Sequence, residues 1–189
     1  MLFIFFILLA GVLFMPVSAS AQKSYGDYLR PDAIEIQYAG NYGLMSVGLG
    51  QEFCKDILTS YLVFGYLPKA VNGVEVKTWA VKNTIQMKQF DLHNQRLTFY
   101  TGVSLIYYQS HNTYTRFPKY FPKSYYDFPT SLHAAPLIGS SWIWNTAKNG
   151  IAFFSEFSTL DYYLINFFRN RNLNFFNLWN LSFGVNCRF

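Results

Sequence analysis

The strongest constraint on the fold is a strict two-residue alternation over residues 179–189. Apolar side chains occupy the odd positions of this stretch, and small or polar side chains occupy the even positions. Because successive side chains of a β-strand point to opposite faces, this period predicts a strand with one apolar and one polar face. The small or polar residues are Asn180, Ser182, Gly184, Asn186 and Arg188. Such a strand suits either a soluble sandwich or the wall of a barrel.

Similar segments recur through the rest of the chain. Apolar patterns predict further strands over residues 34–39, 45–53, 57–67, 74–87, 97–107, 137–145 and 151–158. Within residues 74–87 the apolar phase slips between Val76 and Trp79, which predicts a β-bulge there. Together with residues 179–189 the total is about eight strands, the smallest number found in outer-membrane barrels.

Composition favours the barrel over the sandwich. Aromatic residues make up 21% of the chain and charged residues only 13%, whereas a soluble domain carries about 25% charged residues. After the first residues, no segment reaches the ~18 consecutive apolar residues of a spanning helix. Only helices and closed barrels satisfy their backbone hydrogen bonds in lipid. The sequence therefore predicts an all-β fold, a closed antiparallel up-and-down transmembrane β-barrel of about eight strands.

The connections between the predicted strands alternate between short and long. Short polar turns are expected at residues 54–56, 91–96 and 146–150. The other connections are a tight turn at 41–43 and longer segments at 68–73, 110–136 and 162–172, the last of which partly extends its strands. Outer-membrane barrels have short periplasmic turns and longer external loops. We therefore expect the short turns and both ends of the barrel domain on the periplasmic side.

The first residues predict export. Residues 2–15 form an apolar run that is followed by small residues up to Ala21, which is the pattern of a secretory signal peptide. Cleavage after Ala21 would divide the chain into a signal peptide, residues 1–21, and a barrel domain, residues 22–189, located in the cell outer membrane. No Lys or Arg precedes the apolar run, so an uncleaved anchor is the alternative.

The cysteines and the net charge narrow the expected partners. Cys54 and Cys187 have no metal-type spacing and cannot form a disulfide framework. Their predicted strands are not adjacent, so we expect two separate thiols, with no metal and no cofactor. The net charge of +5 comes from scattered residues, and no nucleic-acid recognition motif accompanies it. Anionic lipid headgroups are therefore the expected partner, and nucleic acid is not.

Aromatic residues near the ends of the predicted strands suggest the two interfacial girdles of an outer-membrane barrel. The candidates are Tyr61, Tyr66, Trp79, Tyr107, Tyr108, Trp142, Trp144, Tyr162, Tyr163 and Trp179. The alternative is that these residues reflect only the general preference of aromatic side chains for strands.

Short aromatic segments of the chain resemble a family of uncharacterised small bacterial outer-membrane β-barrel proteins. They are residues 38–50, FGYLPK at 64–69, FSTLDYY at 157–163 and LSFG at 181–184. The resemblance extends over most of the mature chain; it implies the barrel fold and no catalytic residues. The chain also ends on Phe189, which resembles the terminal signature of outer-membrane barrels and implies recognition by the barrel-assembly machinery.

A second group of residues resembles the sites of membrane enzymes. Small barrels include lipid A acyltransferases and deacylases, which use His, Ser and acidic residues near the outer rim. The comparable residues are Ser131, His133 and His111 in the long connection and Asp161 near a strand end. Ser131 and His133 lie on one face of an extended segment, and a nucleophile needs an oriented base within hydrogen-bonding reach. The simpler interpretation is that both histidines are ordinary loop residues.

Charged residues on the small or polar face predict a network inside the barrel. They are Glu35, Glu52, Glu156 and Arg188. An eight-stranded interior is just wide enough to be filled by side chains, and buried charges must be paired. We therefore expect a Glu–Arg network that plugs the lumen, and not a catalytic or conducting site.

Three basic residues of the long connection, Arg116, Lys119 and Lys123, lie between aromatic residues. Their charge suits lipopolysaccharide phosphates, with an ordinary solvated loop as the alternative. Taken with the barrel, the sequence favours an integral outer-membrane protein with a structural or surface-interaction role, a side-chain-filled lumen and no catalysis. Its expected partners are outer-membrane lipids and lipopolysaccharide. A lipid A-modifying acyl hydrolase or acyltransferase is the alternative, and a small-solute channel is disfavoured because so few strands leave no aqueous lumen.

Overall fold

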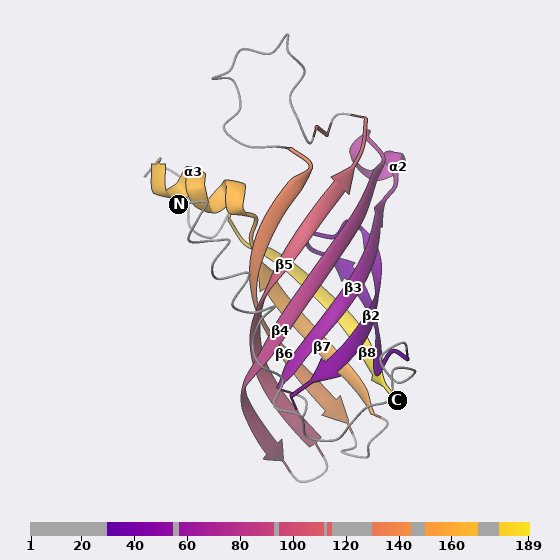
Figure 1. The fold of residues 1–189 in the computed structure, drawn as a ribbon, viewed down its shortest axis with the longest axis vertical. Coiled ribbons are helices and arrows are strands. Elements are labelled where there is room, and N and C mark those ends of the chain that lie inside the picture. Colours follow the sequence, from indigo (N-terminus) through magenta and orange to yellow (C-terminus); the bar gives the residue numbers. More distant parts are fainter. Residues whose placement is uncertain are drawn as a thin grey trace. The chain divides into compact units, whose positions relative to one another are not determined.

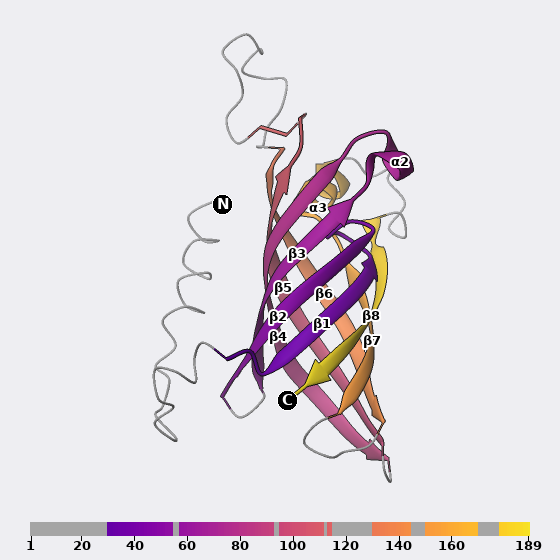
Figure 2. The same cartoon turned by 90° about the vertical axis from the view of Figure 1, so that its right-hand side faces the viewer.

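The chain folds into a closed barrel of eight antiparallel strands, in which each strand pairs with its neighbour in sequence and β8 pairs with β1 (Figures 1 and 2). The computed structural model describes residues 30–54, 57–92, 95–111, 113–114, 130–144, 150–169 and 178–189. The strands are β1 (Ala33–Ala39), β2 (Met45–Phe53), β3 (Leu58–Leu67), β4 (Val76–Leu92), β5 (Gln95–Gln109), β6 (Leu132–Trp144), β7 (Ile151–Ser158) and β8 (Asn180–Arg188). The all-β, up-and-down barrel expected from the alternation is confirmed.

The connection between β5 and β6 is shorter than expected, because β6 begins at Leu132 and not at residue 137. Pro136 therefore lies inside a strand. Proline removes a donor from the ladder and is tolerated only where no partner needs that donor. β7 ends at Ser158, opposite Leu137, so no residue of β7 needs a backbone N–H donor from Pro136.

The irregularity in β4 is displaced from its expected place. The β4–β5 register shifts between Gln86 and Lys88, whereas the β3–β4 pairing is regular throughout. A bulge between Val76 and Trp79 is therefore wrong. Val76 is a half-buried apolar residue on the same face as the buried Thr78, and an apolar residue on the inward face imitates a phase slip in the sequence.

In the described part of the chain, two helices occupy connections at the end of the barrel opposite the short turns. α2 (Lys69–Asn72) joins β3 to β4, and Gly73 ends it in the left-handed conformation with φ of 71°. α3 (Asp161–Arg169) follows β7, so the expectation that residues 162–172 partly extend the strands is wrong over the helix. Within the described residues, no helix is both long and apolar enough to cross a membrane.

Glycines on the inward face make room for large rings that cross the lumen. A Cβ at Gly139 would lie 2.6 Å from the Tyr100 ring, and a Cβ at Gly50 would lie 2.5 Å from the Tyr61 ring. Tyr61 and Tyr108 are buried or half-buried on this inward face, so these two residues do not belong to an outer aromatic girdle. The narrow interior is filled by side chains, as expected for eight strands.

The tight β1–β2 turn folds into the end of the barrel that carries the helices. Tyr42 is buried, and its hydroxyl group hydrogen-bonds to the hydroxyl group of Ser104 on β5. The Asn41 carbonyl oxygen accepts a hydrogen bond from the Tyr108 hydroxyl at 2.6 Å. Asn180 Nδ2 donates to Asn41 Oδ1 at 2.6 Å. The turn therefore closes this end of the lumen with its own side chains.

Both cysteines are free thiols, as expected from the predicted order of the strands. Cys54 follows β2 and Cys187 lies on β8, and β1 pairs between these two strands.

Candidate functional site

The centre of the lumen holds a buried ion cluster built from three strands. Lys82 on β4 is fully buried, and Glu35 on β1 and Glu156 on β7 are nearly so. Lys82 Nζ lies 2.5 Å from Glu35 Oε1 and 3.0 Å from Glu156 Oε1. The three side chains meet because each occupies the inward phase of its strand, so that wall curvature points them at one another.

Rings and hydroxyl groups complete the surroundings of this cluster. Lys82 Nζ lies 4.9 Å from the centroid of the Tyr61 ring and 5.1 Å from that of Phe154, distances at which a cation is attracted to the ring face. The Tyr100 hydroxyl donates a hydrogen bond to Glu156 Oε1 at 2.8 Å. A buried ammonium group is tolerated only when such partners replace its hydration shell.

A second ion pair lies nearer the end with the short turns. Arg188 Nε on β8 is 3.2 Å from Glu52 Oε1 on β2, and both side chains are partly exposed. The four acidic and basic residues expected in the lumen thus separate into two groups. Glu35 and Glu156 bind Lys82, and Arg188 binds Glu52.

Lys82 is the residue that sequence reasoning missed. Lys82 lies between Val81 and Asn83, whose side chains face outward. The bulge expected between Val76 and Trp79 breaks the alternation of this strand, so the sequence pattern does not assign Lys82 to the inward face. Without that interruption, the run Thr78, Ala80, Lys82 and Thr84 forms one continuous inward face. The signal available in the sequence was therefore a lysine in the small or polar phase of a long strand.

A cavity of about 40 Å³ adjoins the ion cluster. Its polar lining includes Glu35, Lys82, Glu156, Asn186 and Arg188. A cavity of this size and polarity accommodates a few water molecules and is far too small for an acyl chain or a solute of the size of a sugar. This cavity is therefore not a pocket for such molecules, and the described side chains around the ion cluster fill the lumen at its level.

A separate polar group lies at the rim, where β6 meets the start of α3. His133 Nδ1 lies 2.9 Å from Asp161 Oδ1, and the backbone N–H of Ala134 donates to Asp161 Oδ2 at 3.1 Å. The second ring nitrogen, His133 Nε2, lies 3.3 Å from the carbonyl oxygen of Thr130. Asp161 therefore links the first turn of α3 to the edge of β6.

The rim group contains two parts of a nucleophilic triad without the third. An acidic residue that orients a histidine is present, and a triad requires the other imidazole nitrogen to bind the nucleophile. Here His133 Nε2 faces a backbone carbonyl. Ser131 is buried, and its hydroxyl group has no hydrogen-bond partner within the described part of the chain. His111 lies exposed just beyond β5.

Arg116, Lys119 and Lys123, expected to bind lipid headgroups, lie outside the described residues. Among the residues that the structure does describe, no group of three His, Cys, Asp or Glu side chains is placed to hold a metal ion.

Comparisons with family models, with curated proteins and with solved structures each find no match for the chain.

Proposed function

We propose that the protein is an integral outer-membrane β-barrel with a structural or surface-interaction role, surrounded by lipid and carrying a side-chain-filled lumen. The short turns would face the periplasm, and the connections with α2 and α3 would face outward. Catalysis is not part of this proposal.

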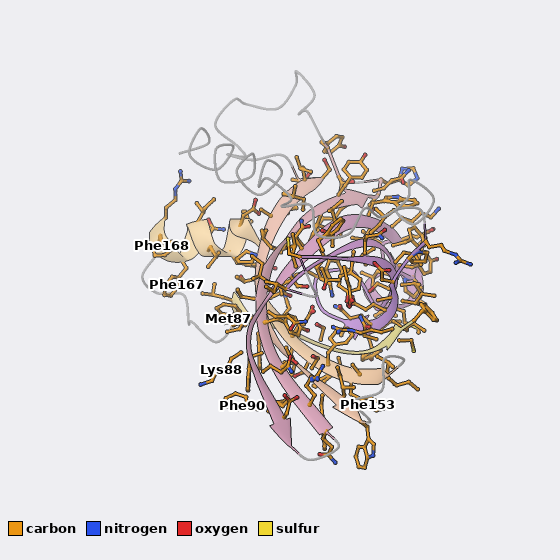
Figure 3. The ribbon with its side chains drawn as sticks, turned by 60° about the horizontal axis from the view of Figure 1, so that its bottom comes forward. Met87, Lys88, Phe90, Phe153, Phe167 and Phe168 are labelled. Atoms are coloured by element: carbon orange, nitrogen blue, oxygen red, sulfur yellow. The ribbon has the colours of Figure 1, made fainter. Side chains whose placement is uncertain are left out.

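The observation that carries the proposal is a belt of exposed apolar side chains on all eight strands. Leu62 on β3, for example, is 58% exposed and Phe153 on β7 is 56% exposed; Figure 3 shows Phe153 pointing away from the barrel. The belt includes Ile36, Val47, Leu62, Val81, Phe99, Ile138, Phe153 and Phe183, one or more from each strand. Soluble monomers rarely expose contiguous apolar patches larger than a few hundred Å².

The distribution of charged side chains supports the same proposal. The buried charges, Lys82 and its carboxylate partners, lie inside the barrel, whereas the outer surface at the same level is apolar. This arrangement reverses that of a water-soluble protein, in which charged side chains are almost always at the surface. It is the arrangement of a barrel whose outer surface meets hydrocarbon.

Aromatic residues mark both edges of the belt. Trp79 and Tyr107 face each other across β4 and β5 near the helix end, and both are exposed. Trp142 and Trp144, whose ring centroids are 5.6 Å apart, lie on β6 near the short turns. Amphipathic rings at two levels of the wall are typical of the two interfaces of a membrane.

Purified protein folded in the presence of phosphatidylcholine vesicles tests the proposal. We expect the folded chain to float with the vesicles through a density gradient and to resist extraction by alkaline carbonate. When the full chain is expressed in a Gram-negative host, it should fractionate with the outer membrane. A folded barrel that stays in the aqueous fraction of both preparations would exclude the membrane function.

A lipid A-modifying acyl hydrolase or acyltransferase is the second candidate, favoured by one observation, the His133–Asp161 pair at the rim. Mass spectrometry of lipid A from cells with and without the protein tests it. An enzyme would change the acylation pattern, and His133→Ala would abolish the change. An identical pattern in all three strains would exclude the enzyme.

A further inference from the structure

The β7–β8 connection leaves the barrel wall at a defined level. β7 ends at Ser158 opposite Leu137, whereas β6 begins at Leu132. Beyond this point the edge of β6 is completed by isolated contacts: Thr159 N–H donates to the Pro136 carbonyl at 3.2 Å, and Ala134 N–H donates to Asp161. A lipid-facing wall needs an unbroken ladder, because unpaired backbone groups are costly in hydrocarbon. In the proposed membrane location, the hydrocarbon layer on this side would therefore end near Ser158.

α3 begins at this level and runs outward from the barrel, across its long direction (Figures 1 and 2). None of its residues is buried. Phe168 is 80% exposed, and Tyr162 and Tyr163 are 49% and 41% exposed. Figure 3 shows Phe167 and Phe168 at the part of the helix farthest from the strands. Aromatic side chains exposed to this extent are costly in water.

The two sides of α3 differ in polarity. Leu164, Phe167 and Phe168 have the spacing of one helical face. Asn166 and Arg169 are three apart and belong to another side. Helices that lie in a membrane interface combine a Phe- and Leu-rich face with a polar, basic face.

The wall below α3 continues this apolar surface. Ile138 on β6 is 50% exposed and pairs with Phe157 on β7, which is 48% exposed. The apolar belt therefore extends up to the level at which the helix leaves the barrel. Lipid that surrounds the belt would also reach the helix.

We infer that α3 is an interfacial lipid-binding helix, which lies in the plane of the outer leaflet with Leu164 and Phe168 inserted at the boundary between headgroups and acyl chains. This inference rests on the proposed membrane function. Asp161 attaches the start of the helix to β6 through Ala134 and His133. The helix would therefore hold the barrel at a fixed depth in the membrane and contact lipid that does not touch the barrel wall.

Nitroxide accessibility of the full chain in phosphatidylcholine vesicles tests the inference. Single labels would be placed through Phe168→Cys, Asn166→Cys and Ile138→Cys, each combined with Cys54→Ser and Cys187→Ser. We expect the label at 138 to collide mainly with oxygen, as a lipid-facing label does, and the label at 168 to do the same at a shallower depth. The label at 166 should collide mainly with a water-soluble nickel complex.

The three positions separate the possible failures. A label at 168 as accessible to the nickel complex as the label at 166, with the label at 138 in lipid, would overturn the interfacial helix and leave the membrane barrel intact. A label at 138 that is accessible to the nickel complex would overturn the proposed function, and the interfacial helix with it. Phe168 is largely exposed, so its replacement leaves the packing of the barrel unchanged.

Discussion

Lys82 Nζ lies 3.0 Å from Glu156 Oε1 across the lumen, although their strands, β4 and β7, are not neighbours in the barrel. The same ammonium group binds Glu35 on β1, so one side chain ties together three separate parts of the wall. The ion cluster therefore connects non-adjacent strands, and its loss should lower the stability of the whole barrel.

Replacing Lys82 should destabilise the barrel strongly. Lys82→Met leaves two buried carboxylates without a cation, and breaking a buried ion pair in this way costs about 3–5 kcal/mol of unfolding free energy. Lys77→Met is the matched control, because Lys77 lies on the same strand and is exposed. Urea unfolding in phosphatidylcholine vesicles measures the unfolding free energy of both variants. Equal effects of the two substitutions would contradict a stabilising role for the cluster.

A charge on the belt should be costly only if the belt meets lipid. Leu62 on β3 and Val71 on α2 are both 58% exposed. We expect Leu62→Arg to lower the stability in vesicles by about 2–4 kcal/mol if it lies near the bilayer midplane, and Val71→Arg to change it by less than about 0.5 kcal/mol. The comparison uses reversible unfolding in vesicles. A tolerated Leu62→Arg would place this surface in water.

A side chain at Gly139 should displace the ring that it faces. The new Cβ of Gly139→Ala would meet Tyr100, whose hydroxyl group donates to Glu156, and such overpacking costs typically about 1–3 kcal/mol. Gly48→Ala is the control, because a Cβ there meets its nearest atom, on Val63, at 3.3 Å. Unfolding free energies should rank Gly139→Ala as the more damaging. The opposite order would mean that Tyr100 is not held in place.

The attachment of α3 should depend on the oxygens of Asp161 more than on its charge. Asp161→Asn keeps an acceptor for the Ala134 N–H, and Asp161→Ala removes it. We expect hydrogen exchange at Ala134 to accelerate in Asp161→Ala by roughly tenfold, which corresponds to the loss of about 1.4 kcal/mol of local stability, a typical net value for one hydrogen bond. Asp161→Asn should change the exchange much less. Equal exchange in all three proteins would contradict the link.

The filled lumen predicts a barrel that does not conduct. Tyr42 closes one end and the Lys82 cluster closes the middle, so the chain in planar lipid bilayers should give no stepwise ion current of the size of a porin. Steady single-channel currents would show that the lumen opens. A porin measured in the same bilayers provides the positive control.

Much of the fold is encoded by local pattern. Alternation predicted eight strands and their order, and the short turns separated them correctly, because a strand with one polar and one apolar face has a period that can be seen in the chain itself. Two local errors have simple causes. Pro136 concealed the start of β6, and inward Val76 imitated a bulge.

The candidate sites were less accessible from sequence. Glu35 and Glu156 were assigned to the inward face, but their shared partner Lys82 was not. Ser131 and His133 satisfied the spacing of one strand face, yet the ring of His133 is turned toward Asp161 and the Thr130 carbonyl. Side-chain direction at a strand end depends on neighbours that are distant in sequence, and the period of the strand carries no information about them.

That the chain forms amphipathic strands with an apolar outer face can be read from the sequence alone, because each strand's period and composition are local properties. Three features appear only in the folded barrel: Lys82 lies between Glu35 and Glu156, the β1–β2 turn enters the lumen, and α3 leaves the wall where β7 ends. These features arise when the sheet closes on itself, since closure and register bring residues of non-adjacent strands within bonding distance.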